Sequence, residues 1–101
     1  MQDLPRRARP AHPSISIVVP CFNEEGCIEE MARRLHAAMD PLGYEWEAVF
    51  VDDGSSDGTA AGLEALAARD PRIGYLSFSR NFGHQMALLA GLGRARGDAV
   101  V

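Results

Sequence analysis

Strand-like and helix-like patterns alternate along the chain, and this alternation restricts the fold more than any other feature of the sequence. Apolar, β-branched runs predict strands at residues 14–20, 46–51, 73–78 and 98–101. Apolar residues at helical spacing predict helices at residues 24–39, 59–69 and 84–95. A β-α-β-α-β-α-β order requires right-handed crossovers between parallel strands. The sequence therefore predicts an α/β fold, with a Rossmann-like parallel sheet and helices on both of its faces.

The same spacing predicts the buried face of each helix. The residues expected to face the core are Ile28, Met31, Leu35 and Met39 in the first helix, Leu63, Leu66 and Ala67 in the second, and Met86, Leu89, Ala90 and Leu92 in the third. We expect Asn23 to cap the first helix, with Glu24 and Glu25 in its positive first turn. Asp57 or Ser56 is expected to cap the second helix.

Composition places the chain among globular proteins. Its 101 residues are 47% hydrophobic, enough for one core, and carry a formal net charge of -4. This acidic balance does not indicate a protein that binds nucleic acid. Cys21 and Cys27 lack metal-ligand spacing, so we expect reduced thiols in a reducing compartment. Residues 1–13 are rich in proline and arginine and are expected to form a disordered lead-in to a domain over residues 14–101.

No apolar run approaches the ~18 residues of a membrane span, and the N-terminus lacks the apolar core of a secretory signal. We therefore expect a cytoplasmic chain. The fourth predicted strand stops after three or four residues, so we expect the chain to be the N-terminal piece of a longer protein. The sequence does not fix the oligomeric state, and a homo-oligomer stays open.

Polar clusters follow three of the predicted strands. They are Pro20-Cys21-Phe22-Asn23-Glu24, Asp52-Asp53-Gly54-Ser55 and Ser79-Arg80-Asn81-Phe82-Gly83. In a parallel sheet the carboxyl ends of the strands lie at one edge, and ligands bind there. The sequence therefore predicts a ligand site at this edge.

Two adjacent acids, Asp52 and Asp53, end the second predicted strand and admit three interpretations. Residues 53–64 match most ligand positions of an EF-hand calcium loop, but an EF-hand needs a helix before the loop and the preceding run is strand-like. Turn and cap chemistry explains Asp57, but not two acids at a strand end. A carboxylate can also accept charge-assisted hydrogen bonds from the N–H edge of a nucleotide base, which the glycine-rich turn allows to approach. We favour nucleotide recognition.

Three segments, VVPCFNEE, VFVDDGSSDGT and RNFGHQMALLAGLGRARGDAVV, together resemble the N-terminal half of family 2 glycosyltransferases with the GT-A fold. The resemblance covers about residues 15–101. The nearest likeness is to the polyprenyl-phosphate branch, which includes dolichol-phosphate mannose synthase and the bacterial undecaprenyl-phosphate sugar transferases. The resemblance implies that this chain is the nucleotide-sugar-binding half of a GT-A domain.

The resemblance and the strand-end clusters give a set of expected donor-binding residues. They are Pro20, Phe22, Asn23, Glu24, Val51, Asp52, Asp53, Arg80, Asn81 and Gly83. In the family, the residue matching Asp53 contacts the base, and the residue matching Val51 packs beside it. Phe22 stands where tyrosine is usual and keeps the flat apolar wall without the hydroxyl.

Several of these residues have two interpretations. Glu24 is expected either to accept from ribose hydroxyls or to be a first-turn acid of the helix. Asp52 is ranked below Asp53, because it is expected to point inward and cap backbone donors. Arg80 either pairs with a phosphate of the donor or lipid, or forms a salt bridge at the rim. For His84, a neutral capping or packing role is favoured over phosphate binding.

The resemblance implies inverting transfer of a sugar from a UDP- or GDP-sugar to a polyprenyl phosphate at the cytoplasmic face of a membrane. In the family a divalent metal, Mg²⁺ or Mn²⁺, is held by a D-x-D motif and offsets the charge of the leaving diphosphate. We expect that motif, the catalytic residues, the acceptor groove and the membrane-binding region beyond Val101, so the chain alone is expected to be inactive. Two other functions stay open: transfer to a sugar hydroxyl in polysaccharide synthesis, and a non-catalytic module that binds nucleotide sugars.

Overall fold

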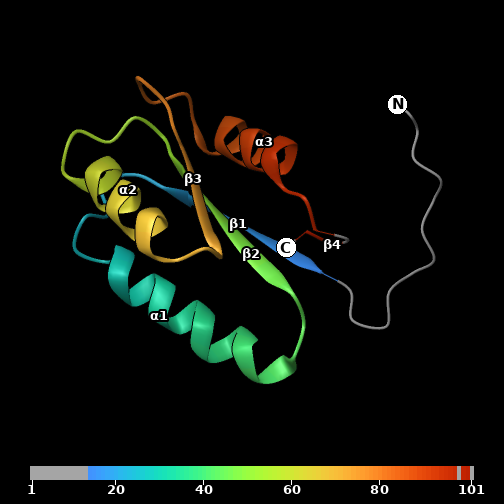
Figure 1. Cartoon of the computed structure of the whole chain (residues 1–101). Coiled ribbons are helices and arrows are strands. Elements are labelled where there is room, and N and C mark those ends of the chain that lie inside the picture. The colour runs from blue at the N-terminus through green and yellow to red at the C-terminus, as the bar shows by residue number, and fades with distance from the viewer. Residues whose placement is uncertain (1–13, 98, 101) are drawn as a thin grey trace.

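The computed structural model describes residues 14–97, 99 and 100, which form a parallel four-stranded sheet with helices on both faces (Figure 1). The strands are β1 (Ile15–Cys21), β2 (Trp46–Asp52), β3 (Ile73–Ser77) and β4 (Ala99–Val100). The helices are α1 (Ile28–Met39), α2 (Thr59–Arg69) and α3 (His84–Arg94), with a short 3-10 helix, η1 (Asp40–Leu42). The predicted α/β fold is confirmed. The lead-in predicted for residues 1–13 lies outside the described residues.

The strand order in the sheet is β3-β2-β1-β4, so the chain builds outward from β1 to β3 and then crosses back to add β4 beside β1. Cys21, Asp52 and Ser77 pair across the ends of β1, β2 and β3. The loops after these three strands therefore leave the sheet at the same level. In sheets of this type, ligands bind at the carboxyl ends of the strands where the strand order reverses.

Helices α1 and α2 cover one face of the sheet, and α3 covers the other (Figure 1). The first face has the larger core, which is built around Phe50, Leu63 and Trp46. The second face has a smaller cluster, with Val49 and Val51 beneath α3. Successive strand residues point to opposite faces, so β2 supplies side chains to both cores.

The predicted inward faces of α1 and α2 are confirmed, because every residue named for them lies in the larger core or packs against it. For α3 the prediction is wrong at three positions. Met86, Leu89 and Leu92 are 50%, 61% and 51% exposed. Helix α3 buries Ala87 and Gly91 instead.

Small residues decide how α3 lies on the sheet. A Cβ atom at Gly91 would lie 2.3 Å from Cγ1 of Val18 on β1, closer than Cβ atoms come to their neighbours in real proteins. Of the residues predicted to face inward, only Ala90 packs against the smaller cluster. Helical spacing selects the largest apolar residues, whereas close packing of this helix on the sheet requires the smallest.

The predicted helix starts are corrected in part. Helix α1 begins at Ile28, so Asn23 does not cap it, and Glu24 and Glu25 precede its first turn. The reason is that the side chain of Asn23 is used in a contact between two loops, described below. Helix α2 begins at residue 59, as predicted. Gly58 occupies its N-cap position, but the Asp57 carboxylate accepts from the N–H of the first helical residue, Thr59, at 2.9 Å.

Candidate functional site

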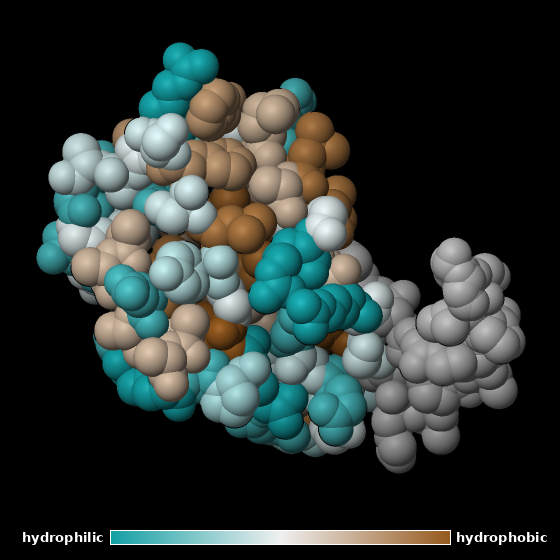
Figure 2. Space-filling view, turned by 45° about the horizontal axis from the view of Figure 1, so that its top comes forward, coloured by the Kyte–Doolittle hydropathy of each residue, from teal (hydrophilic) through white to brown (hydrophobic). Residues whose placement is uncertain are grey.

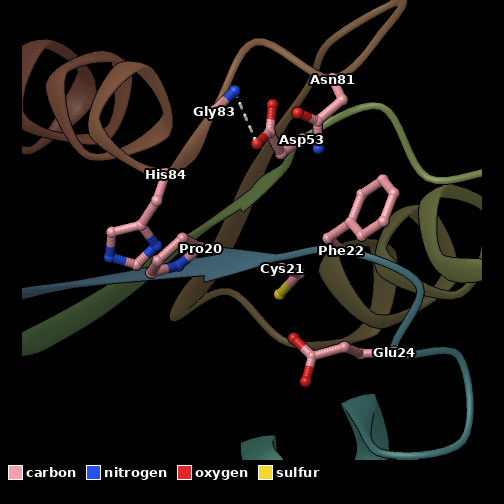
Figure 3. Close-up of a pocket in the computed structure, with 8 residues that line it drawn as sticks. All are labelled: Pro20, Cys21, Phe22, Glu24, Asp53, Asn81, Gly83 and His84. Carbon is pink, nitrogen blue, oxygen red and sulfur yellow. Dashed lines mark hydrogen bonds between the residues drawn. The ribbon is translucent and has the colours of Figure 1, made fainter.

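A pocket of about 340 Å³ lies at the carboxyl edge of the sheet (Figure 3). Its volume falls in the range of small-molecule sites. The lining residues are Pro20, Cys21, Phe22, Glu24, Asp53, Asn81, Gly83 and His84. They come from the end of β1, from the segments after β1, β2 and β3, and from the first residue of α3. The structure thus confirms that the three polar clusters meet at one edge.

Hydrogen bonds join the loop after β1 to the loop after β2. The backbone N–H of Asn23 donates to Oγ of Ser55 at 2.8 Å, and Oδ1 of Asn23 accepts from the N–H of Ser56 at 2.8 Å. The N–H of Glu24 donates to Oγ1 of Thr59 at 2.9 Å. Asn23 has a left-handed backbone, with φ at 53°, and does not line the pocket. Its role in the described structure is to connect the two loops.

Asp52 points into the protein, as expected from the sequence. Its side chain is buried, with 1% of the residue exposed. Oδ1 accepts from the backbone N–H of Ser55 at 3.1 Å and from the hydroxyl of the same serine, and Oδ2 accepts from the Ser77 hydroxyl at 3.0 Å. Asp52 therefore closes the turn after β2, joins it to the end of β3, and lies outside the pocket lining.

Asp53 is buried and also lines the pocket. Its Oδ1 accepts from the backbone N–H of Phe82 at 2.8 Å, and its Oδ2 accepts from that of Gly83 at 3.1 Å; Figure 3 draws the second bond. A carboxylate has about four acceptor positions. Two are used by the backbone of the loop after β3, so about two are left for a ligand.

Glu24 and Phe22 present groups to the pocket that the fold does not use. The first turn of α1 holds Glu29 and Glu30, so the first-turn alternative for Glu24 is wrong. The Glu24 carboxylate makes no hydrogen bond or ion pair with any other residue that the structure describes, and it lines the pocket. Phe22 also lines the pocket and is 47% exposed. Exposing an aromatic ring to water is unfavourable, so the ring offers an apolar surface to a ligand.

Two lining residues, Cys21 and His84, are absent from the predicted set. Burial, together with the negative charges of Glu24 and Asp52, raises the pKa of the Cys21 thiol to about 12. The thiol is therefore neutral near pH 7 and is no nucleophile. His84 begins α3, and the helix has no side-chain cap, so the capping role expected for it is not seen. Cys21 lies between Pro20 and Phe22, and His84 directly follows Gly83. This adjacency to predicted site residues is the sequence signal that could have identified them.

Arg80 and Val51 also lie outside the pocket lining. The guanidinium carbon of Arg80 lies 4.6 Å from the centroid of the Phe82 ring, a cation–π contact. Arg80 forms no salt bridge with the residues described, so that alternative for it is not seen. Val51 is fully buried in the smaller cluster. The structure therefore brings together six of the ten predicted site residues: Pro20, Phe22, Glu24, Asp53, Asn81 and Gly83.

Metal-ligating side chains do not gather in this site. Among residues 14–97, 99 and 100, no group of three or more His, Cys, Asp or Glu could hold a metal ion. The residues described therefore do not fit a catalytic divalent metal, and we assign them no step that uses one. The calcium-loop interpretation fails on the fold, because the strand β2 stands where an EF-hand requires a helix.

The strand order and the lining residues define an α/β domain with a pocket at the carboxyl ends of its parallel strands, which is where sheets of this type bind ligands. Residues 16–101 match the family model of glycosyl transferase family 2, and the chain belongs to this family.

Named relatives agree with this membership. The chain is 48% identical over 87 residues to the bactoprenol glucosyl transferase of Shigella phage SfV, covering 86% of this chain and 28% of that protein. It is 42% identical over 88 residues to the undecaprenyl-phosphate 4-deoxy-4-formamido-L-arabinose transferase of Pseudomonas fluorescens, covering 86% of this chain and 26% of that protein. The chain thus spans between a quarter and a third of the length of these relatives.

A solved structure supports the fold. The mannosyltransferase PcManGT from Pyrobaculum calidifontis, in complex with GDP-Man and Mn²⁺, superposes with a TM-score of 0.76 and 28% identity. The match covers 88% of this chain and 26% of that chain. No helix in the described part of this chain has the length and apolar character needed to cross a membrane.

Proposed function

We propose that this chain binds the donor nucleotide of a glycosyltransferase that transfers a sugar, with inversion, from a nucleotide diphosphate sugar to a polyprenyl phosphate. The observation that supports this best is the pocket lined by the Phe22 ring and by the Glu24 and Asp53 carboxylates. A flat base packs on an aromatic wall. The carboxylates accept hydrogen bonds from N–H groups of the base and from ribose hydroxyls.

The charge of the pocket favours the nucleoside part of the donor over its diphosphate. Glu24 and Asp53 line it, Asp52 lies close behind, and no arginine or lysine is among the lining residues. Such a site repels a diphosphate and attracts hydrogen-bond donors. The phosphates are therefore expected to extend toward His84, where the N-terminal end of α3 favours negative charge.

Four of the lining residues, Asp53, Glu24, Asn81 and Gly83, have these roles in the proposal. Asp53 accepts from the base with the acceptor positions that the backbone leaves free, and Glu24 accepts from the ribose. Asn81 and Gly83 form the wall that faces them. Arg80, which lies outside the pocket lining, is the guanidinium proposed to meet a phosphate of the donor or the lipid.

The acceptor is inferred from the relatives, which are named for bactoprenol and undecaprenyl phosphate. A lipid phosphate is already anionic near neutral pH, so it needs less help from a general base than a sugar hydroxyl does. Because the acceptor is a membrane lipid, we place the reaction at a membrane surface, on its cytoplasmic face. A divalent metal, Mg²⁺ or Mn²⁺, would have to be held by residues other than those described here.

Titration calorimetry of UDP, GDP and the nucleosides uridine and guanosine tests the proposal. The chain should bind at least one of the two bases, and the nucleoside should retain most of the affinity of the nucleotide. Glu24→Gln should weaken that binding by about 1–3 kcal/mol, the cost of losing a charged acceptor.

Glu25→Gln is the matched control, because Glu25 is the next residue and bonds the backbone N–H of Gly58 outside the pocket. It should leave nucleotide affinity unchanged. The proposal is refuted if the unmodified chain binds neither nucleotide, or if Glu24→Gln and Glu25→Gln have the same affinity as the unmodified chain.

A further inference from the structure

Polar contacts hold the wall of the pocket that follows β3, together with one edge-to-face ring contact between Phe82 and Phe78, whose centroids lie 5.4 Å apart. This wall, defined as residues 80–84, supplies three lining residues, Asn81, Gly83 and His84. Arg80, Asn81 and Phe82 are exposed, and Phe82 is 45% exposed. An exposed loop of this kind needs specific hydrogen bonds to keep one conformation.

Asp53 supplies those bonds. Its two carboxylate oxygens accept from two consecutive backbone N–H groups, those of Phe82 and Gly83, at 2.8 and 3.1 Å. Asp53 is only 5% exposed, so its carboxylate is well shielded from competing water. Charge-assisted bonds to backbone N–H groups are the stronger kind. The same side chain that lines the pocket from β2 therefore fixes the opposite wall.

Gly54 allows the backbone of the wall to lie close to the turn after β2. Its φ is +78°, and a Cβ atom there would lie 2.1 Å from the carbonyl carbon of Arg80 and 2.3 Å from the backbone nitrogen of Asn81. The glycine expected to make room for a base thus makes room first for the backbone of the wall. Asp53 and Gly54 act on the wall from adjacent positions of one turn.

We propose that Asp53 is a positioning residue for donor binding, which acts through the backbone of Phe82 and Gly83 to hold residues 80–84 in place. The effect on donor binding rests on the proposed function, whereas the hydrogen bonds between Asp53 and the wall do not depend on it. In Asp53→Asn one carboxylate oxygen becomes an NH₂ group, which is a donor facing a donor. One of the two backbone N–H groups then loses its acceptor, and the wall is released.

Hydrogen exchange of individual amides measures the release directly, without any ligand. In Asp53→Asn the amides of Phe82 and Gly83 should exchange about tenfold faster or more. Asp57→Asn is the matched control, because Asp57 also accepts from backbone N–H groups, those of Thr59 and Glu25, and lies outside the pocket lining. It should speed exchange at those two amides and leave Phe82 and Gly83 unchanged.

Gly54→Ala displaces the wall while keeping the Asp53 carboxylate, and it serves if Asp53→Asn does not fold. It should also speed exchange at Phe82 and Gly83. Unchanged exchange at both amides in Asp53→Asn, or in Gly54→Ala where only that variant folds, overturns the proposal.

Two ligands separate positioning from direct contact with a base. Asp53→Asn should weaken the binding of UDP and also of ribose 5-phosphate, which has no base, because the wall is displaced for both. A loss confined to UDP would overturn the positioning role. If the unmodified chain binds no nucleotide at all, the proposed function fails, while the amide exchange of Phe82 and Gly83 still decides whether Asp53 holds the wall.

Discussion

The two faces of the sheet are built in different ways. Beneath α1 and α2 lies a core of large side chains, among them Phe50, Trp46 and Leu63. Beneath α3 the helix is held close to the sheet by small residues, and the buried cluster is small. The large apolar side chains of α3 lie at the surface. Figure 2 shows hydrophobic residues exposed on the side of the molecule that α3 covers.

The larger core and the pocket wall therefore lie on different faces of the sheet. The pocket wall at residues 80–84 leads directly into α3, so it belongs to the thinly packed face. Asp53 and Gly54 hold that wall from the end of β2, a strand that is buried on both sides. A rigid strand thus positions a polar loop, which is how binding residues are generally supported.

Truncating one leucine on each face gives the largest expected contrast. Leu63→Ala, at a fully buried position of α2, should lower the free energy of unfolding by about 2–5 kcal/mol. Leu89→Ala, at a position of α3 that is 61% exposed, should change it by no more than about 0.5 kcal/mol. Urea denaturation followed by circular dichroism measures both. Equal losses for the two variants would show that the faces do not differ in packing as described.

Two glycines of α3 test how close the helix lies to the sheet. At Gly91 a Cβ atom would clash with Val18, so Gly91→Ala should cost about 1–3 kcal/mol of overpacking. Gly93 lies in the same helix with nothing within 4 Å of a Cβ atom. Gly93→Ala should therefore stabilise the protein by about 0.5–1 kcal/mol through helix propensity. If Gly91→Ala were stabilising as well, the close contact between α3 and β1 would be wrong.

The contrast also explains how far the sequence could predict the fold. Apolar periodicity predicted the inward faces of α1 and α2 correctly, because large residues fill the larger core. It failed for α3, where Ala87 and Gly91 make the contact and periodicity gives small residues little weight. A clash between Gly91 and Val18 depends on the distance between helix and sheet, which no sequence pattern contains.

The candidate site was predictable to the extent that it follows from strand ends. Parallel strands in register bring Pro20, Asp53 and Asn81 to one edge, as the order of elements implies. The sequence did not indicate that the Asp53 carboxylate is shared with the backbone of the loop after β3. That contact depends on loop conformation, as does the stacking of Arg80 on Phe82, which keeps the guanidinium out of the pocket lining.

A polar cluster on the α1–α2 face centres on His36 and Trp46. Nε2 of His36 lies 2.7 Å from Oδ2 of Asp70, and its Nδ1 lies 2.9 Å from Oδ2 of Asp40. The ring packs edge-on against Trp46, whose indole N–H donates to Oδ1 of Asp40 at 3.0 Å. The guanidinium carbon of Arg72 lies over the Trp46 ring, 5.2 Å from its centroid.

The smallest expected effect is the dependence of this cluster on pH. Hydrogen bonds to Asp70 and then Asp40 raise the pKa of His36 above its ordinary value of 6.5, because only the imidazolium can donate to both carboxylates. A raised folded pKa means that the stabilisation is complete below pH 6.5 and is lost as pH rises through the folded pKa. Since the ion pairs are partly exposed, the loss should be less than about 1 kcal/mol.

Unfolding from pH 5.5 to 9, followed by the fluorescence of Trp46, the single tryptophan, compares the unmodified chain with His36→Gln. The advantage of the unmodified chain over His36→Gln should shrink as pH rises, because the imidazolium that bridges α1 to the turn before β3 is lost. A constant gap for His36→Gln would mean that proton binding to His36 does not stabilise the α1–α2 face, and only its packing against Trp46 would then remain.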